Sequence, residues 1–156
     1  MKLIQQSAEI WQQPEGEVGI YKQVEKAARL CYKSEDKVTE DSYKRFIDML
    51  NDRGHNSPLE HGTVYLVTIN TDMVYKYSHN PYSKVHVGDV LVPGDYTTTR
   101  YCITTNYRVI KEHGWEDDLK YLCKPTEYHE KRISVHITTS RSISHELVRH
   151  KILCVA

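Results

Sequence analysis

The hydrophobic period changes along the chain, and this change constrains the fold more than any other feature. Residues 18–32 follow the helical period. One face of this predicted helix carries the apolar side chains Ile20, Val24, Ala27, Ala28 and Cys31. Arg29 is expected on the other side. Later stretches follow the strand period or are rich in β-branched residues, so the chain predicts an α+β fold.

A second helix is expected to begin near Thr39, with Glu40 and Asp41 in its first turn, where negative charge suits the helix dipole. Its apolar stripe consists of Tyr43, Phe46, Ile47 and Leu50. Gly54 is well placed to end this helix. Residues 63–69 are rich in β-branched side chains and predict a strand.

The middle of the chain carries many turn signals between residues 72 and 98, which predict an irregular segment. These signals are Asn80-Pro81, Gly88-Asp89 and Pro93-Gly94-Asp95. Residues 99–104 predict another strand, followed by a short helix over residues 106–112 that ends at Gly114.

Residues 132–138 alternate as a strand does, with Ile133, Val135 and Ile137 on one face. Ser140 or Ser142 can then cap a final helix. That helix is expected to carry Ile143, Leu147 and Val148 inward. The whole pattern predicts one α+β domain over residues 1–156, with a mixed, largely antiparallel sheet flanked by helices.

Composition narrows the range of partners. Lys plus Arg and Asp plus Glu both number 21, so a net charge of zero argues against steering toward nucleic acid or membrane. The 12 tyrosines against one phenylalanine suit partly wet subunit interfaces. No cysteine pair has the C-x-x-C spacing of a zinc or dithiol site, and no stretch has the apolar length of a signal or membrane segment. A cytoplasmic protein with free thiols is expected.

The first candidate site is the run Gly54-His55-Asn56-Ser57-Pro58-Leu59-Glu60-His61, between the second helix and the first strand. Two histidines, a hydroxyl and a carboxylate within eight residues can serve acid–base chemistry or a metal. The metal interpretation is weak, because the His-x5-His spacing lacks the helical register that places two imidazoles on one ion. The structural alternative is a helix cap and a short turn held by Glu60.

The second candidate site lies on the final helix. Arg141, His145 and Arg149 are spaced by four and share one face, while Glu146 and His150 form the adjacent row. Such a cationic stripe can hold phosphate or a planar acidic heterocycle through guanidinium donors. The structural alternative is a solvated face with weak intrahelical ion pairs.

Three blocks, in order, resemble the flavin-dependent thymidylate synthase family. Ala27-Ala28-Arg29-Leu30-Cys31-Tyr32 resembles a block in the first helix of that family. The run 54–61 matches its G-H-x-S/T-x-x-E-H loop. Ser144-His145-Glu146-Leu147-Val148-Arg149-His150-Lys151 matches the helix that opens its signature, R-H-R-x-x-S-x-[NQ]-E-x-S-x-R. Single matches are weak, but their ordered combination is fairly specific.

The resemblance implies roles for both sites. His55, Ser57 and Glu60 would lie at the flavin of FAD. Arg149, His150 and Lys151 would also hold FAD. Glu146 and Arg149 would bind dUMP. His55 and Arg149 are the candidate catalytic residues, since the arginine that activates the pyrimidine in the family has no counterpart in these 156 residues. No metal ligand is expected.

The signature departs from the family pattern at two positions. Lys151 stands where the family has its second arginine, which keeps the charge but loses the planar fork. Cys154 stands where the family has serine, exchanging a good hydroxyl donor for a weak thiol donor. The second half of the signature does not occur before Ala156. We therefore expect the N-terminal portion of such an enzyme, and little activity from this chain alone.

The implied reaction is the reductive methylation of dUMP to dTMP. NADPH reduces FAD, 5,10-methylenetetrahydrofolate supplies the carbon, and the active sites lie between subunits of a homotetramer. Residues 72–131 are expected to be a family-variable insertion without a catalytic role, and its Trp115, Tyr121 and Tyr128 are expected to be core or interface residues. The alternatives are a non-catalytic remnant that binds flavin or nucleotide, and an unrelated phosphate-binding interaction module.

Overall fold

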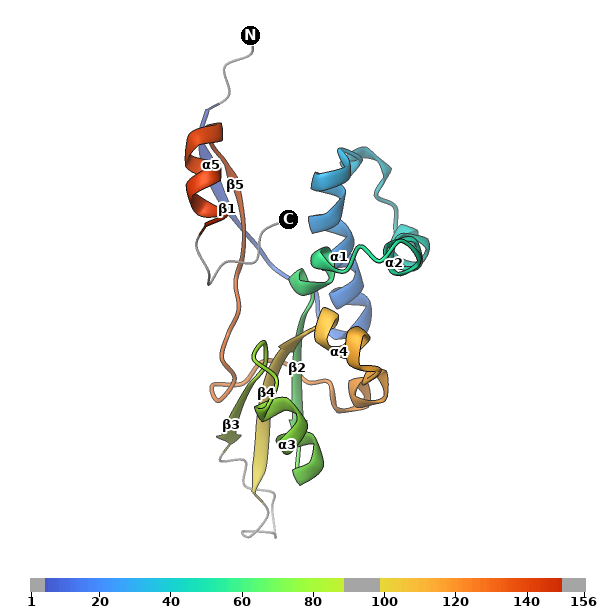
Figure 1. Ribbon diagram of the computed structural model, residues 1–156, viewed down its shortest axis with the longest axis vertical. Helices are drawn as coiled ribbons and strands as arrows, with labels where there is room; N and C mark the ends of the chain where they lie inside the picture. Colours follow the sequence, from blue (N-terminus) through green and yellow to red (C-terminus); the bar gives the residue numbers. More distant parts are fainter. Residues whose placement is uncertain (1–4, 89–98, 150–156) are drawn as a thin grey trace.

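A computed structural model describes residues 5–88 and 99–149 and shows an α+β chain with two antiparallel sheets (Figure 1). A three-stranded sheet has the order β2-β4-β3, formed by Thr63–Thr68, Arg100–Asn106 and Lys84–Gly88. A two-stranded ribbon pairs β1 (Ser7–Trp11) with β5 (Ser134–Thr138). The predicted fold class is confirmed, and all strand pairs in the described part of the chain are antiparallel.

Most of the described helices belong to the main body, which is the part of the molecule that contains the three-stranded sheet. They are α1 (Gly16–Tyr32), α2 (Ser42–Asp52), α3 (Thr71–Ser78) and α4 (Tyr107–His113). Short 3-10 turns cover Glu35–Lys37 (η1), Ser57–His61 (η2) and Glu116–Tyr121 (η3). The last helix, α5 (Arg141–Leu147), lies beside the β1–β5 ribbon at one end of the molecule (Figure 1). None of these helices, within the described residues, is long and apolar enough to cross a bilayer.

The core lies where α1 meets α2, η2 and the three-stranded sheet. It is built by fully buried aliphatic side chains from several elements: Ile20, Val24, Leu50, Leu59, Val64, Leu66, Ile103 and Ile110. Each such side chain contributes about 1.5–3 kcal/mol relative to exposure. The predicted stripe of α2 is buried as expected. Trp115 and Tyr121 pack against this core, as the sequence predicts for them.

The first helix corrects two expectations about its faces. Cys31 is exposed, whereas Arg29 is only 7% exposed. Arg29 is buried because it is fully partnered: its Nε and Nη2 donate to Oε1 of Glu25 at 2.8 and 2.7 Å. Its guanidinium also lies 4.4 Å from the ring centroid of Phe46. An arginine with these contacts can belong to a buried face.

Two further boundaries differ from the sequence prediction. Helix α2 begins at Ser42, because the Ser42 hydroxyl accepts from the amide of Thr39 at 2.9 Å and holds the preceding residues as a turn. The stretch predicted to be irregular contains α3 and β3. Asn70 caps α3 through its side chain, which accepts from the amide of Asp72 at 2.8 Å. The turn signal Asn80-Pro81 therefore follows α3, and Gly88 is the last residue of β3. Asp89 and the signal Pro93-Gly94-Asp95 lie outside the described residues.

The β1–β5 ribbon exposes alternating apolar side chains of β5 and of Ile133, which directly precedes it. Ile133, Val135 and Ile137 are 70%, 47% and 44% exposed, and Ile10 opposite Val135 is 61% exposed. The other face of the ribbon is tied to α1, because Nζ of Lys26 lies 3.8 Å from the ring centroid of Trp11. The ribbon thus has one apolar face without a second layer among the described residues.

Helix α5 also differs from the expectation that its apolar residues point inward. Ile143 and Val148 are 43% and 56% exposed, and only Leu147 is half-buried. Ser140 is the cap residue, without a side-chain cap hydrogen bond. The helix lies at the margin of the chain, where the narrow ribbon offers too little surface to cover it.

Candidate functional site

The η2 loop is held by its apolar residues and by a glycine at each end. Gly54 has a φ of +64°, which turns the chain out of α2. Pro58 and Leu59 are buried beneath the loop. A Cβ at Gly62 would lie 2.8 Å from Cγ2 of Ile20 and equally close to Cγ2 of Val24, so this end of the loop lies directly on α1. Anchored in this way, the loop leaves His55 and Ser57 exposed.

Helix α1 contacts the first polar residue of the loop. The hydroxyl of Tyr32 is hydrogen-bonded to Nδ1 of His55. Tyr32 is itself held by an edge-to-face contact with Phe46, with ring centroids 5.8 Å apart. The backbone of His55 is fixed as well, because its amide donates to the carbonyl of Leu50 at 2.9 Å. Both the position and the ring of His55 are therefore defined.

Helix α4 holds two other polar residues of the loop, Glu60 through Arg108 and Asn56 through Glu112. One guanidinium nitrogen of Arg108 donates to Glu60, and Nε donates to Oε1 of Glu112 at 2.7 Å. The same Glu112 oxygen accepts from Nδ2 of Asn56 at 3.3 Å. The bond from Arg108 is the leading reason that the pKa of Glu112 lies below its usual range. Glu60 thus holds the loop against α4 through Arg108.

Arg108 lies outside every set of site residues predicted from the sequence. It falls in the segment 72–131, for which no catalytic role is predicted. The spacing of Arg108 and Glu112 indicates an ordinary i, i+4 helix pair. The contact with Glu60 joins residues 48 positions apart, and no local pattern predicts it.

The remaining histidine of the loop is half-buried. Burial is the main cause that lowers the pKa of His61, so its neutral form is favoured near neutral pH. Among the described residues, no group of three or more His, Cys, Asp or Glu side chains is placed to hold a metal ion.

The second predicted cluster lies on α5 and is solvent-exposed. Arg141, His145, Glu146 and Arg149 are all exposed. Nη1 of Arg149 donates to Oε1 of Glu146 at 3.0 Å. Glu146 is thereby paired with a cation, and the cluster keeps a positive stripe along one side. His150, Lys151 and Cys154 lie outside the described residues.

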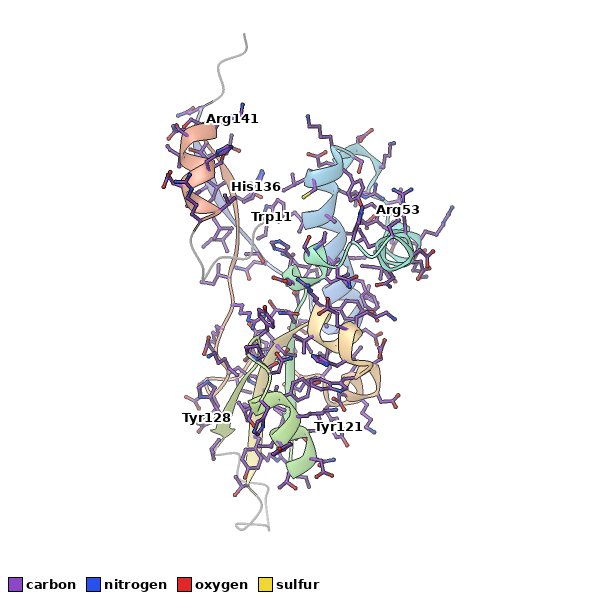
Figure 2. All side chains as sticks on the ribbon, in the orientation of Figure 1. Trp11, Arg53, Tyr121, Tyr128, His136 and Arg141 are labelled. Atoms are coloured by element: carbon purple, nitrogen blue, oxygen red, sulfur yellow. The ribbon has the colours of Figure 1, made fainter. Side chains whose placement is uncertain are left out.

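Among the members that the structure describes, which exclude His150 and Lys151, the two clusters are not brought together. In Figure 1, α5 stands with the ribbon, apart from the η2 loop between α1 and α4. Figure 2 shows Arg141 at the end of the molecule opposite to Tyr121 and Tyr128. The polar loop and the cationic helix are therefore two separate surfaces of one chain.

A cavity of about 530 Å³ lies elsewhere, between residues 10–16, β2 and residues 122–134. No described residue of either cluster lines it. Its walls are fixed: the Gln13 side chain exchanges two 2.8 Å hydrogen bonds with the backbone of Thr63. Two of its cations are engaged, Lys124 with Glu15 at 2.9 Å and Arg132 with the carbonyl of Tyr82 at 2.6 Å. The cavity is not part of the predicted site.

Cys123 and His129 lie together but are not arranged as a nucleophile and base. The distance between Sγ of Cys123 and Nε2 of His129 is 3.8 Å. Nδ1 of His129 accepts from the amide of Thr126 at 3.1 Å, so Nε2 carries the proton and donates to the carbonyl of Leu66 at 3.1 Å. Burial raises the pKa of Cys123 to about 11. Both groups are neutral and structural.

The class that these features define is an α+β protein with an ordered His-Ser-Glu loop and a separate cationic helix. Residues 18–75 match the family model described as thymidylate synthase complementing protein. This match covers α1 from residue 18 onward, all of α2 and the η2 loop. It confirms, over that part of the chain, the resemblance to the flavin-dependent thymidylate synthase family. No curated protein and no solved structure was found to match the chain.

Proposed function

We propose that this chain belongs to the machinery of flavin-dependent thymidylate synthesis, the reductive methylation of dUMP to dTMP. The observation that carries the proposal is the position of the η2 loop, with His55, Ser57 and Glu60, inside the family match over residues 18–75. In this proposal FAD delivers hydride after reduction by NADPH, and 5,10-methylenetetrahydrofolate is the carbon donor.

The chemistry of the loop fits a flavin. The Ser57 hydroxyl is exposed and makes no hydrogen bond to the described residues, so it is free to bind an incoming polar group. His55 is exposed, with Nδ1 engaged by Tyr32. Both can donate hydrogen bonds to the ring carbonyls and nitrogens of a flavin. Glu60 acts mainly by keeping the loop in place through Arg108.

The cationic helix fits the anionic parts of the ligands. We assign Arg149, with His150 and Lys151, to FAD, and Glu146 and Arg149 to dUMP. A bare carboxylate at Glu146 would repel a nucleotide phosphate, but the 3.0 Å contact with Arg149 neutralises it and leaves its second oxygen for a ribose hydroxyl.

The separation of the two clusters supports a site shared between copies of the chain. The loop of one copy and α5 of another can then face the same ligand. The exposed apolar face of the ribbon gives such an assembly a surface to bury. We therefore propose a homotetramer, which light scattering of the purified chain would test by its mass.

A FAD titration followed by flavin fluorescence tests the proposal. Saturable binding is expected, and Ser57→Ala is expected to weaken it about two- to tenfold, the effect of one hydrogen bond. Ser78→Ala, an exposed serine on α3, is the matched control and should leave binding unchanged. Wild-type chain that binds no FAD would refute the proposal.

A turnover assay distinguishes an active thymidylate synthase from a flavin-binding protein without catalysis. dUMP-dependent oxidation of NADPH by the FAD-loaded chain indicates the enzyme. FAD binding without that oxidation indicates a flavin-binding protein that lacks catalysis. Binding of inorganic phosphate without any FAD binding would instead favour a phosphate-binding interaction module.

A further inference from the structure

The hydrogen bond between Tyr32 and His55 bears on which imidazole nitrogen carries the proton. Nδ1 of His55 is the atom bonded to the Tyr32 hydroxyl. A phenolic hydroxyl can donate or accept, and a neutral imidazole has one nitrogen that accepts and one that donates. With the hydroxyl as donor, Nδ1 accepts and the imidazole proton lies on Nε2; with Nδ1–H as donor, the hydroxyl accepts and Nε2 carries no proton. A phenol is a better donor than acceptor, because its oxygen lone pair is delocalised into the ring, and this favours the first arrangement.

We propose that Tyr32 is a positioning residue that holds His55 in the Nε2–H form, so that the η2 loop presents a neutral hydrogen-bond donor to its ligand. The ligand atom that this donor fits is an acceptor, either a carbonyl oxygen or an unprotonated ring nitrogen of a planar heterocycle. This inference rests on the proposed function only for the statement that His55 faces the ligand.

The surroundings of both residues support a fixed arrangement. Tyr32 is the last residue of α1, and its ring packs edge-to-face on Phe46. His55 follows the Gly54 turn, and its backbone is bonded to Leu50. The rings of Tyr32 and His55 are 6.1 Å apart between centroids and inclined by 33°. Because each residue is held independently, loss of the hydroxyl removes the hydrogen bond without removing either ring.

The protonated nitrogen of His55 can be read directly from nitrogen-15 chemical shifts of the full chain without any ligand. The spectrum is recorded at about pH 8.5, two units above the ordinary imidazole pKa of about 6.5. His55→Gln assigns the signal by removing it. In the wild type, Nδ1 is expected to show the shift of an acceptor nitrogen and Nε2 that of a protonated nitrogen. A proton found on Nδ1 would overturn the proposal, whatever the chain does with flavin.

Tyr32→Phe supplies the second measurement. One hydrogen bond favours the bonded form about two- to tenfold, so this variant is expected to shift toward a more even mixture of both forms. Tyr43→Phe, a buried tyrosine of α2 whose hydroxyl does not contact His55, is the control. Unchanged shifts in Tyr32→Phe would show that the hydroxyl does not select the protonated nitrogen.

A double-mutant cycle on FAD affinity then distinguishes the positioning of His55 by Tyr32 from a purely structural role of Tyr32. Tyr32→Phe is expected to weaken FAD binding about two- to tenfold in the wild-type background and to have no further effect in His55→Gln. An equal loss in both backgrounds would mean that Tyr32 acts through packing alone. If wild-type chain binds no FAD, the proposed function fails while the chemical shifts still decide the role of Tyr32.

Discussion

The buried pair of Glu25 and Arg29 offers the sharpest test of how α1 is stabilised. Their side chains are 2% and 9% exposed and lie 2.7 Å apart. Arg29→Met removes the cation but keeps the helix propensity and most of the side-chain volume. The carboxylate of Glu25 is then buried without its partner, which costs about 3–5 kcal/mol. This is a large part of the 5–15 kcal/mol that stabilises a typical domain.

The comparison with a double variant shows where that cost arises. Glu25→Leu combined with Arg29→Met removes both charges and is expected to recover most of the lost stability. Recovery stays incomplete, because Arg29 also lies against Phe46 and donates to the carbonyl of Ser34 at 3.3 Å. Lys44→Met breaks an exposed ion pair with Asp41 and serves as the control, with no measurable change expected.

Urea unfolding followed by circular dichroism measures these differences in the free energy of unfolding from the shift of the midpoint, provided that the m-value stays unchanged. If the free energy of unfolding of Arg29→Met lies within about 1 kcal/mol of that of the wild type, the loss is smaller than breaking a buried ion pair should cause, and the pair is not effectively buried. A double variant no more stable than Arg29→Met would show that packing, rather than the unpaired carboxylate, accounts for the loss.

Three other outcomes are expected. Arg108→Gln should weaken FAD binding about fivefold or more, because the loop loses its contact with α4. Arg45→Gln, on the exposed face of α2, is the control and should leave FAD binding unchanged. Equal FAD affinities of the two variants would contradict the role given to α4. Gly62→Ala should lower stability by about 1–3 kcal/mol, measured in urea, because its Cβ would meet two α1 side chains at 2.8 Å; a neutral effect would mean that the loop end moves freely. Burial raises the pKa of Cys123 from 9.0 to about 11, so the neutral thiol contributes stability that is fully present below pH 9.0 and is lost as the pH rises to about 11. In Cys123→Ala this contribution to the pH dependence of unfolding should disappear. An unchanged pH profile in that variant would contradict the role given to Cys123.

The sequence predicted those elements whose signals are local. The stripe of α2 and the β-branched run of β2 each occupy the predicted place. Helix α4 begins and ends as predicted, because Asn106 caps it by accepting from the amide of Val109 and Gly114 ends it with a φ of +67°. In these cases the residues that specify the element lie within it or next to it.

The contacts that give the candidate site its shape could not be predicted in this way. Arg29 belongs to the buried face only because Glu25, one turn earlier, and Phe46 on another helix receive its guanidinium. The bond between Arg108 and Glu60 joins α4 to the loop, although the two residues are 48 positions apart in the sequence. From the sequence alone, a charged side chain is predicted to be exposed, because charged residues are rarely buried without a partner. A partner that is distant in sequence becomes known only once the fold is known.

Residues 72–131 illustrate a related point. They supply β4, the middle strand of the three-stranded sheet, and α4, which holds the η2 loop. The prediction that they form a family-variable insertion stays a prediction. Their contribution to the core nevertheless means that the loop could not keep its present contacts without them.

The pairing of β1 with β5 also sets the order in which the chain can fold during synthesis. Ser7 pairs with Thr138, so nearly all of the intervening chain must leave the ribosome before the first strand finds its partner. The helices and the η2 loop, whose contacts are closer in sequence, can form earlier. Until then the strand Ser7–Trp11 lacks β5, the strand with which it pairs in the structure. We expect the new chain to depend on chaperones most strongly in this interval, and the ribbon to be the last part of the fold to close.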